Sequence, residues 1–250
     1  MAELVIQEGQ GERRPLVIAY HTSADYLRGV HPTAAIWSFY GPEHNGGAVR
    51  PLGELVGRAR AQGFEPDPLV LVGWSKGVQN VRTHLNEGTE ARAQVDGVVS
   101  LDGAHADTGF VDESDVEPWE WAANQAEDGQ LAFTWPTSRV PAFDYESTRA
   151  VAERVLGPIQ DGTRDTGSFR LIATPGGGEE EHVRHAAMAK TEVPRVIELA
   201  KQNGARVGRL LGAALGAALG GVAGGAWKGT EGAAVGAVAG GALGAFLGGL

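Results

Sequence analysis

The chain has 250 residues, and 15 of its 38 glycines lie in residues 205–250 together with 13 alanines. The formal net charge of the whole chain is −10. Residues 205–250 contribute +2, so residues 1–204 carry −12. So acidic a body argues against binding to nucleic acid, because it would repel phosphate. The absence of cysteine excludes disulfides, zinc–thiolate sites and a cysteine nucleophile. We therefore expect two domains, a globular one at 1–204 and a glycine-rich one at 205–250.

Along residues 1–204, short and uniformly apolar runs alternate with segments of helical period. The apolar runs predict strands at 16–20, 34–40, 68–73, 95–101, 131–135 and 169–174. The helical periods lie at 49–62, 78–88, 145–157 and 182–202. Strands that are apolar on both faces indicate an α/β fold, with a mostly parallel sheet and helices on both faces. Residues 103–130 are acidic and aromatic, and we expect them to form a surface excursion or lid.

A glycine-flanked serine lies between a predicted strand and a predicted helix. Gly73-Trp74-Ser75-Lys76-Gly77 fits the pattern G-x-S-x-G. The strand–turn–helix context is that of a nucleophile elbow, which exposes the serine Oγ at the amino end of a helix. A serine hydroxyl becomes a useful nucleophile only when a base takes its proton and a carboxylate orients that base.

Candidates for the carboxylate and the base follow Ser75 in the chain. Asp102 ends the strand at 95–101 and is our first choice as the acid, and the alternative is Asp144, which follows the strand at 131–135 by eight or nine residues. His182 is our first choice as the base, because it lies nearer the end of the last strand than the alternative, His185. Asp102 is also an ordinary turn former, and Asp144 an ordinary helix N-cap.

The runs PLVIAYHTS and LVLVGWSKG, with the elbow, make the chain resemble an α/β-hydrolase over about residues 14–202. In that family the acid usually follows the later strand, near Asp144, and in a minority it stands where Asp102 is. The resemblance implies an oxyanion hole formed by the backbone amides of Thr22 and Lys76, although His21-Thr22 replaces the usual His-Gly. It implies no cofactor. A metal site at His182 and His185 is disfavoured, because no third ligand is recognisable.

The glycines of the last segment recur every fourth residue. They stand at 208, 212, 216, 220 and 224, and again at 232, 236, 240, 244 and 248. This spacing gives the small-xxx-small groove through which helices associate in membranes, and the segment resembles a glycine zipper. Uncharged stretches of 18 and 19 residues correspond to helices of about 27–28 Å, just short of a hydrocarbon core of about 30 Å. We expect a helical hairpin at 205–250 that enters a membrane or self-associates.

These features predict a serine hydrolase for an ester, thioester or amide, with a small-molecule or lipid ester as substrate. The alternative is a noncatalytic membrane-inserting or pore-forming protein whose hydrolase-like body binds a ligand. The first residues, MAELVIQEGQGERRPL, lack the basic patch and apolar run of a signal peptide. We therefore expect a membrane-associated protein made without a signal peptide, and otherwise a cytoplasmic one.

Overall fold

The computed structural model of the chain describes residues 3–39, 49–110, 112–140 and 145–205. The chain divides into two units, Met1–Ala200 and Lys201–Leu250. The predicted glycine zipper, from residue 206 onward, lies outside the described residues, as does the alternative acid Asp144. The predicted domain boundary between residues 204 and 205 therefore stays a prediction.

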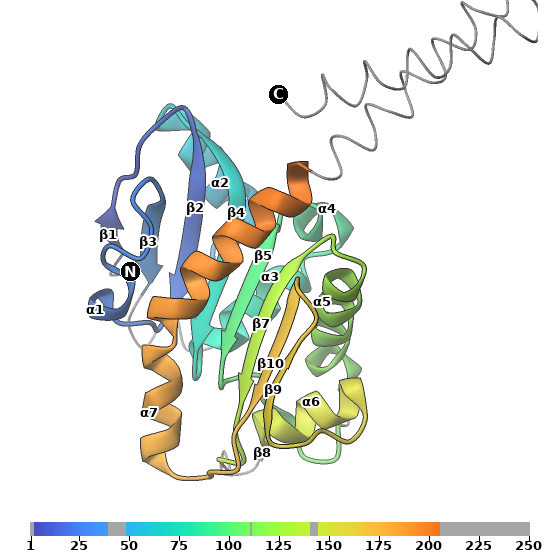
Figure 1. The fold of residues 1–250 in the computed structure, drawn as a ribbon. Helices are drawn as coiled ribbons and strands as arrows, with labels where there is room; N and C mark the ends of the chain where they lie inside the picture. Colours follow the sequence, from blue (N-terminus) through green and yellow to red (C-terminus); the bar gives the residue numbers. More distant parts are fainter. Residues whose placement is uncertain (1–2, 40–48, 111, 141–144, 206–250) are drawn as a thin grey trace, which may run out of the picture. The chain divides into compact units, whose positions relative to one another are not determined.

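Within the described residues, an eight-stranded and mostly parallel sheet forms the centre of the first unit (Figure 1). The strand order is β1-β3-β2-β4-β5-β7-β10-β9. The inner strands are parallel, whereas β1 and β9 pair antiparallel at the two edges. The strands are β1 (Glu3–Gln7), β2 (Arg13–Tyr20), β3 (Ala35–Phe39), β4 (Glu65–Trp74), β5 (Gly97–Leu101), β7 (Ala132–Thr137), β9 (Gly162–Asp165) and β10 (Phe169–Ala173). The predicted fold class, an α/β fold with a mostly parallel sheet, is confirmed.

Helices cover both faces of this sheet. They are α1 (Ala24–Leu27), α2 (Leu52–Ala61), α3 (Gly77–Leu85), α4 (Thr89–Arg92), α5 (Glu117–Glu127), α6 (Thr148–Leu156) and α7 (Glu179–Ala187), with a 3-10 turn, η2 (Glu113–Asp115). A further helix runs from residue 189 to 205, and Figure 1 shows its first part lying across the front of the sheet. Strands β6 (Ala106–Asp107) and β8 (Tyr145–Glu146) form a small second sheet.

The uniformly apolar strands bury side chains on both faces. On β2, Leu16 and Ile18 pack into the cluster on the α2, α3 and α5 side. Val17 and Ala19, which point the other way, pack with the helix that begins at residue 189. The absence of polar alternation in the sequence therefore reflects two covered faces.

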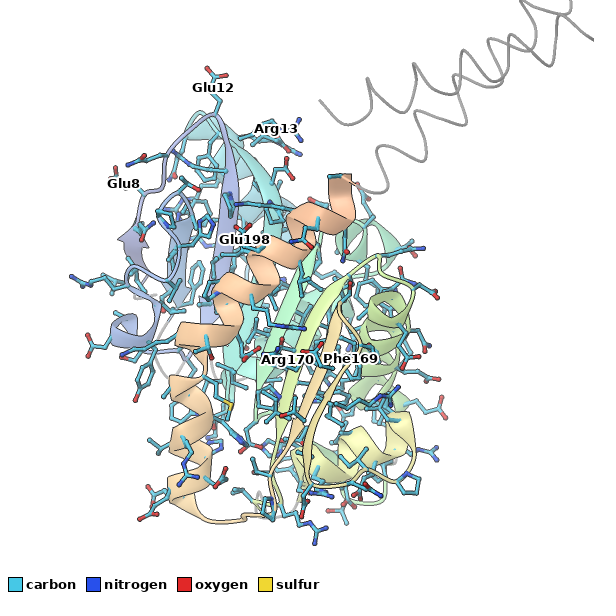
Figure 2. The ribbon with its side chains drawn as sticks, in the orientation of Figure 1. Glu8, Glu12, Arg13, Phe169, Arg170 and Glu198 are labelled. Atoms are coloured by element: carbon cyan, nitrogen blue, oxygen red, sulfur yellow. The ribbon has the colours of Figure 1, made fainter. Side chains whose placement is uncertain are left out.

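Strand β10 shows the same division with a polar side. Phe169 is fully buried in the cluster that contains α5. Its neighbour Arg170 pairs with Glu192 at 3.2 Å on the opposite face. Figure 2 labels both Phe169 and Arg170. The helix that begins at residue 189 is thus held by an ion pair as well as by apolar contacts.

The structure differs from the sequence expectation at α5. This helix lies inside the segment 103–130, which we expected to be a surface excursion, but its Trp119 is fully buried. The Trp119 ring centroid lies 6.5 Å from that of Phe133 and 6.0 Å from that of Trp135. Because large aromatic rings dominate the energy of a core, α5 belongs to the layer that covers the sheet.

Candidate active site

Ser75 lies in a sharp turn between β4 and α3. Its φ is +52°, a left-handed conformation that is rare for a residue with a side chain. The Ser75 amide donates to the Leu101 carbonyl of the neighbouring strand end at 3.1 Å, and the Val78 amide donates to the Ser75 carbonyl at 3.0 Å. The side chain is half-buried. The local geometry is therefore that of the elbow predicted from G-x-S-x-G.

Two glycines let other segments approach this turn closely. A Cβ at Gly77 would lie 2.2 Å from the Tyr20 carbonyl oxygen, so the start of α3 packs directly on the end of β2. A Cβ at Gly103 would lie 1.9 Å from the Ser75 carbonyl oxygen. This crowding requires Gly77, the second glycine of the motif. It also requires Gly103, which lies outside the motif.

Asp102 follows β5 directly, also with a left-handed φ of +50°, and is only 1% exposed. Its carboxylate is held from the end of β7. The Ser138 amide donates to Asp102 Oδ1 at 2.9 Å, and the Ser138 hydroxyl donates to Oδ2 at 2.7 Å. This double contact fixes the direction in which the remaining lone pairs of the carboxylate point.

Both predicted histidines meet that carboxylate from α7. His182 Nδ1 lies 2.9 Å from Asp102 Oδ2, and His185 Nδ1 lies 3.2 Å from the same oxygen. They differ in access, because the His182 side chain is 19% exposed and that of His185 is 0% exposed. Only His182 therefore combines contact with the carboxylate and access to a bound molecule.

The charge state of Asp102 follows from these contacts. Burial by itself would raise the pKa of this carboxyl, but the contacts with His182, His185 and Ser138 outweigh it and hold the pKa well below its usual range. Asp102 is therefore ionised at neutral pH and provides a fixed negative charge beside His182.

The two predicted oxyanion donors follow neighbouring strands. Tyr20 is in register with Gly73 across β2 and β4, so the segments that contain Thr22 and Lys76 leave the sheet side by side. Thr22 is buried, with its hydroxyl donating to the Tyr20 carbonyl at 3.1 Å. Lys76 is the N-cap of α3 and its side chain is exposed. Their backbone amides remain predicted donors.

Sequence reasoning gave no role to Trp74, His21 and Ser138 at this site. The Trp74 ring lies against both His21 and His182. Burial lowers the pKa of His21, and electrostatic repulsion from the neighbouring Lys76 and His182 side chains lowers it further. Trp74 stands inside the motif and His21 at a strand end, which are usable signals, whereas Ser138 has no local signal.

Asp144 lies outside the described residues, and the N-cap of α6 is Ser147, whose hydroxyl accepts from the Ala150 amide at 3.2 Å. In the part of the chain that the structure describes, no group of three or more acidic or histidine side chains is arranged to hold a metal ion.

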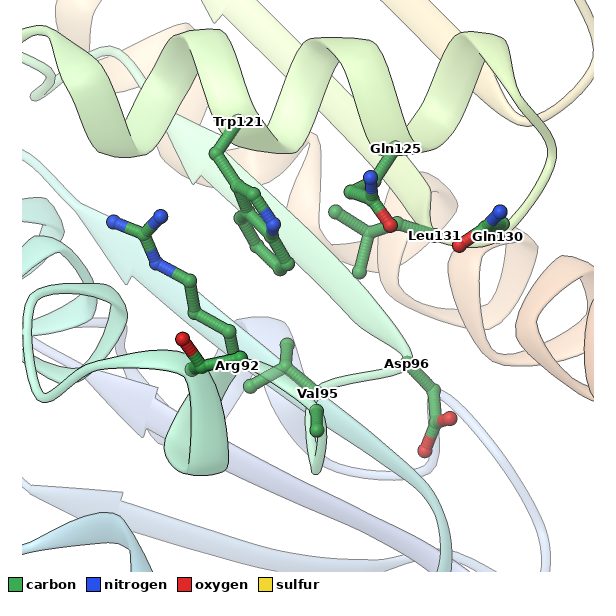
Figure 3. Close-up of a pocket in the computed structure, with 9 residues that line it drawn as sticks. Arg92, Val95, Asp96, Trp121, Gln125, Gln130 and Leu131 are labelled. Atoms are coloured by element: carbon green, nitrogen blue, oxygen red, sulfur yellow. The ribbon is translucent and has the colours of Figure 1, made fainter.

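A separate groove of about 490 Å³ lies at the opposite end of the strands from Ser75 (Figure 3). Trp121 and Gln125 reach into it from α5, and Asp96 and Leu131 line it directly before β5 and β7. These are the amino ends of the parallel strands, whereas Ser75 and Asp102 follow carboxyl ends. Ligands bind at carboxyl ends in open α/β sheets, so the groove is distinct from the candidate active site.

Comparison with known proteins gives one family match, at the end of the chain. Residues 201–250 match the glycine zipper 2TM domain. No curated protein matches the chain. Across the residues that are described, none of the helices has both the length and the apolar character needed to cross a membrane.

Two solved structures are similar at low identity. An uncharacterised protein from Capnocytophaga ochracea DSM 7271 is 12% identical with a TM-score of 0.49, over 78% of this chain and 59% of that one. An ester-hydrolase from the metagenome of Lake Arreo, complexed with a derivative of bipyridine phosphonate, is 14% identical with a TM-score of 0.37, over 79% and 75%. The chain thus spans 59% of the length of the first of these proteins. It combines an α/β fold, evident in its own strand order, with a C-terminal segment similar to glycine zipper 2TM domains.

Proposed function

We propose that this protein is a serine hydrolase that cleaves an ester, thioester or amide. Ser75 is the nucleophile, His182 the general base and Asp102 the carboxylate that orients the base. The observation that carries the proposal is the 2.9 Å contact between His182 Nδ1 and buried Asp102 Oδ2, at the sheet edge where the Ser75 elbow opens. Three residue types that act together in acyl transfer thus meet at one edge.

The reaction proceeds in two half-reactions. Asp102 holds the proton on His182 Nδ1, so that Nε2 accepts the proton of the Ser75 hydroxyl as its oxygen attacks the carbonyl carbon. The amide of Thr22, after β2, and the amide of Lys76, at the amino end of α3, stabilise the oxyanion that forms. His182 then gives its proton to the leaving group, which departs and leaves an acyl ester on Ser75. Water, deprotonated by His182, hydrolyses that ester and restores the serine.

The choice of His182 over His185 rests on access. A general base must reach the proton that it removes, either directly or through one water molecule. His185 has no exposed side-chain surface, and its Nε2 faces Thr174 Oγ1 at 3.4 Å and Glu181 Oε1 at 3.7 Å. His185 is therefore assigned a supporting position behind Asp102.

The C-terminal segment brings this enzyme to a membrane or joins copies of it. The match of residues 201–250 to the glycine zipper 2TM domain supports this part of the proposal. A lipid ester, or another ester close to a membrane, is then the substrate class that the enzyme meets most often.

A fluorophosphonate probe tests the proposal, since it reacts covalently with an activated serine. We expect labelling of wild-type protein at Ser75, located by peptide mass spectrometry, and none in folded Ser75→Ala. Ser100→Ala is a suitable control, because that serine is fully buried in β5. Labelling at a different serine, or a folded wild-type protein that does not react, overturns the assignment.

A further inference from the structure

Trp74, the residue before Ser75, lies against the rings of two histidines, His21 and His182. Its ring centroid lies 5.4 Å from that of His21, with 21° between the planes. It also lies 5.2 Å from the ring centroid of His182, with 31° between the planes. His21 directly follows β2, Trp74 is the last residue of β4 and His182 lies in α7, so the three rings join separate parts of the candidate site.

The indole also holds the backbone of the same histidine. Trp74 Nε1 donates a hydrogen bond to the His182 carbonyl at 3.1 Å. His182 is in the first turn of α7, so this bond ties the start of the helix to the end of β4. Trp74 therefore contacts both the ring and the main chain of His182.

Asp102 alone does not fix the direction of the His182 ring. A single hydrogen bond at Nδ1 sets a distance, but the ring is still able to turn about that bond. A flat indole against the imidazole face limits this turn, and the hydrogen bond to the carbonyl limits movement of the helix start. Together they determine where Nε2 points.

We propose that Trp74 is a positioning residue that holds the His182 imidazole in the plane required to take the Ser75 proton, with His21 packed against the same indole. The inference rests on the proposed hydrolase function. It extends the role of the elbow, because the same turn then presents the nucleophile and orients the base.

The contact is also suited to the charge that His182 gains. An indole face attracts a cation within about 6 Å of its centroid, and His182 becomes an imidazolium when it accepts the Ser75 proton. The contact between Trp74 and His182 therefore favours the charged intermediate as well as the geometry that leads to it.

Two substitutions separate the contacts. Trp74→Phe keeps an aromatic face but loses the N–H donor, and Trp74→Leu loses both. Trp121→Leu is the matched control, since Trp121 is also half-buried but lines the groove at the opposite sheet edge. Folding of each variant is checked by far-UV circular dichroism.

The first measurement is the rate of fluorophosphonate labelling at Ser75, with kcat and KM for a small p-nitrophenyl ester. We expect Trp74→Leu to label about 100-fold more slowly, the loss associated with a displacement of about 1 Å at a reacting group. Trp74→Phe should recover part of that loss. The effect should appear in kcat with little change in KM, and Trp121→Leu should match the wild type.

The second measurement needs no activity. The ring-current shift of the His182 Cε1–H proton in an NMR spectrum should diminish in Trp74→Leu and persist in Trp121→Leu. A folded Trp74→Leu that labels at the wild-type rate and leaves this resonance in place overturns the inference; if that variant does not fold, Trp74→Phe with wild-type kcat does so. A wild-type Ser75 that does not react overturns the hydrolase and this inference together, so the two failures are distinguishable.

Discussion

At the scale of single residues, the carboxylate of Asp102 brings the candidate site together. It contacts His182, His185 and Ser138 while it is only 1% exposed. A buried charge without partners costs several kcal/mol, so these donors are a condition for keeping an ionised acid at this position. The same carboxylate contacts His182, the more exposed of the two histidines.

Substitutions at these residues separate the base from its neighbour. Asp102→Asn should reduce kcat by about 10⁴, because an amide favours the wrong tautomer of His182. His182→Ala should lose several orders of magnitude in kcat, with little change in KM. His185→Ala should be much milder in kcat, and turnover of a p-nitrophenyl ester by purified variants measures all three. A larger loss of kcat in His185→Ala than in His182→Ala would exchange their roles.

Asp96, at the groove on the opposite edge, gives a prediction about pH and stability. Burial raises the pKa of its carboxyl from 3.8 to about 6, although the Leu69 amide donates to it at 2.8 Å. The folded state therefore holds a proton that the unfolded state releases, and stability falls as pH rises from about 4 to about 6. At about 1.4 kcal/mol per pKa unit, Asp96→Asn should be more stable than the wild type by about 3 kcal/mol at pH 8.

Urea unfolding at pH 4 and at pH 8 measures this difference. The two proteins should have similar midpoints at pH 4, and Asp96→Asn the higher midpoint at pH 8. An equal difference at both pH values would mean that ionisation of Asp96 is not the cause.

At the scale of elements, a buried polar chain fastens β2 to α3 and α2. The Tyr20 hydroxyl lies 2.6 Å from His84 Nε2, and His84 Nδ1 lies 2.6 Å from Glu87 Oε1. Glu87 Oε2 accepts from the Leu52 amide at 2.8 Å, at the first residue of α2. Because α3 begins at the elbow and β2 ends at Tyr20, this chain of contacts helps to fix the two segments that carry the predicted oxyanion donors.

Tyr20→Phe tests how much this chain stabilises the fold. The substitution leaves buried His84 Nε2 without its partner, and an unsatisfied buried polar group costs about 1–3 kcal/mol. We expect a lower urea midpoint with an unchanged slope. Tyr145→Phe is the control, because Tyr145 is 54% exposed and should change stability little. Equal midpoints for Tyr20→Phe and wild type would show that the chain contributes no stability.

At the scale of the whole molecule, the two parts differ in composition and are expected to act independently. A chain truncated after Gly204 should be a soluble and acidic monomer that still hydrolyses a small soluble ester, because Ser75, Asp102 and His182 all precede the cut. The full chain should float with liposomes or form detergent-resistant oligomers. Chromatography and liposome flotation of both proteins measure this.

The double substitution Gly216→Leu with Gly240→Leu distinguishes helix pairing from a simple apolar anchor. Leucine fills the groove between small residues and raises hydrophobicity at the same time. We expect weaker assembly of the full chain. A simple anchor would instead bind liposomes more tightly, with its assembly unchanged.

The amino-acid sequence by itself determined those parts of the protein that depend on local pattern. The apolar runs located the inner strands, and the glycines around Ser75 located the elbow, because backbone strain and crowding leave few residue types there. Asp102 was identifiable as the residue at a strand end. The edge strand β9 gave no such signal, since its four residues are exposed and it forms by pairing with β10.

The difference in exposure between candidates that share one local pattern is visible only in the tertiary structure. His182 and His185 lie three residues apart on one helix, and their sequence context does not tell which ring stays accessible beside Asp102, some 80 residues earlier. The support from Ser138 and the indole of Trp74 likewise joins segments that are distant in the chain. Such contacts form because the carboxyl ends of the parallel strands lie on one side of the sheet. The burial of each side chain there depends on every element that packs around it. Trp119 is a further example. Its segment is acidic and aromatic in sequence, but it forms a core helix because the Trp119 ring packs against Phe133 and Trp135.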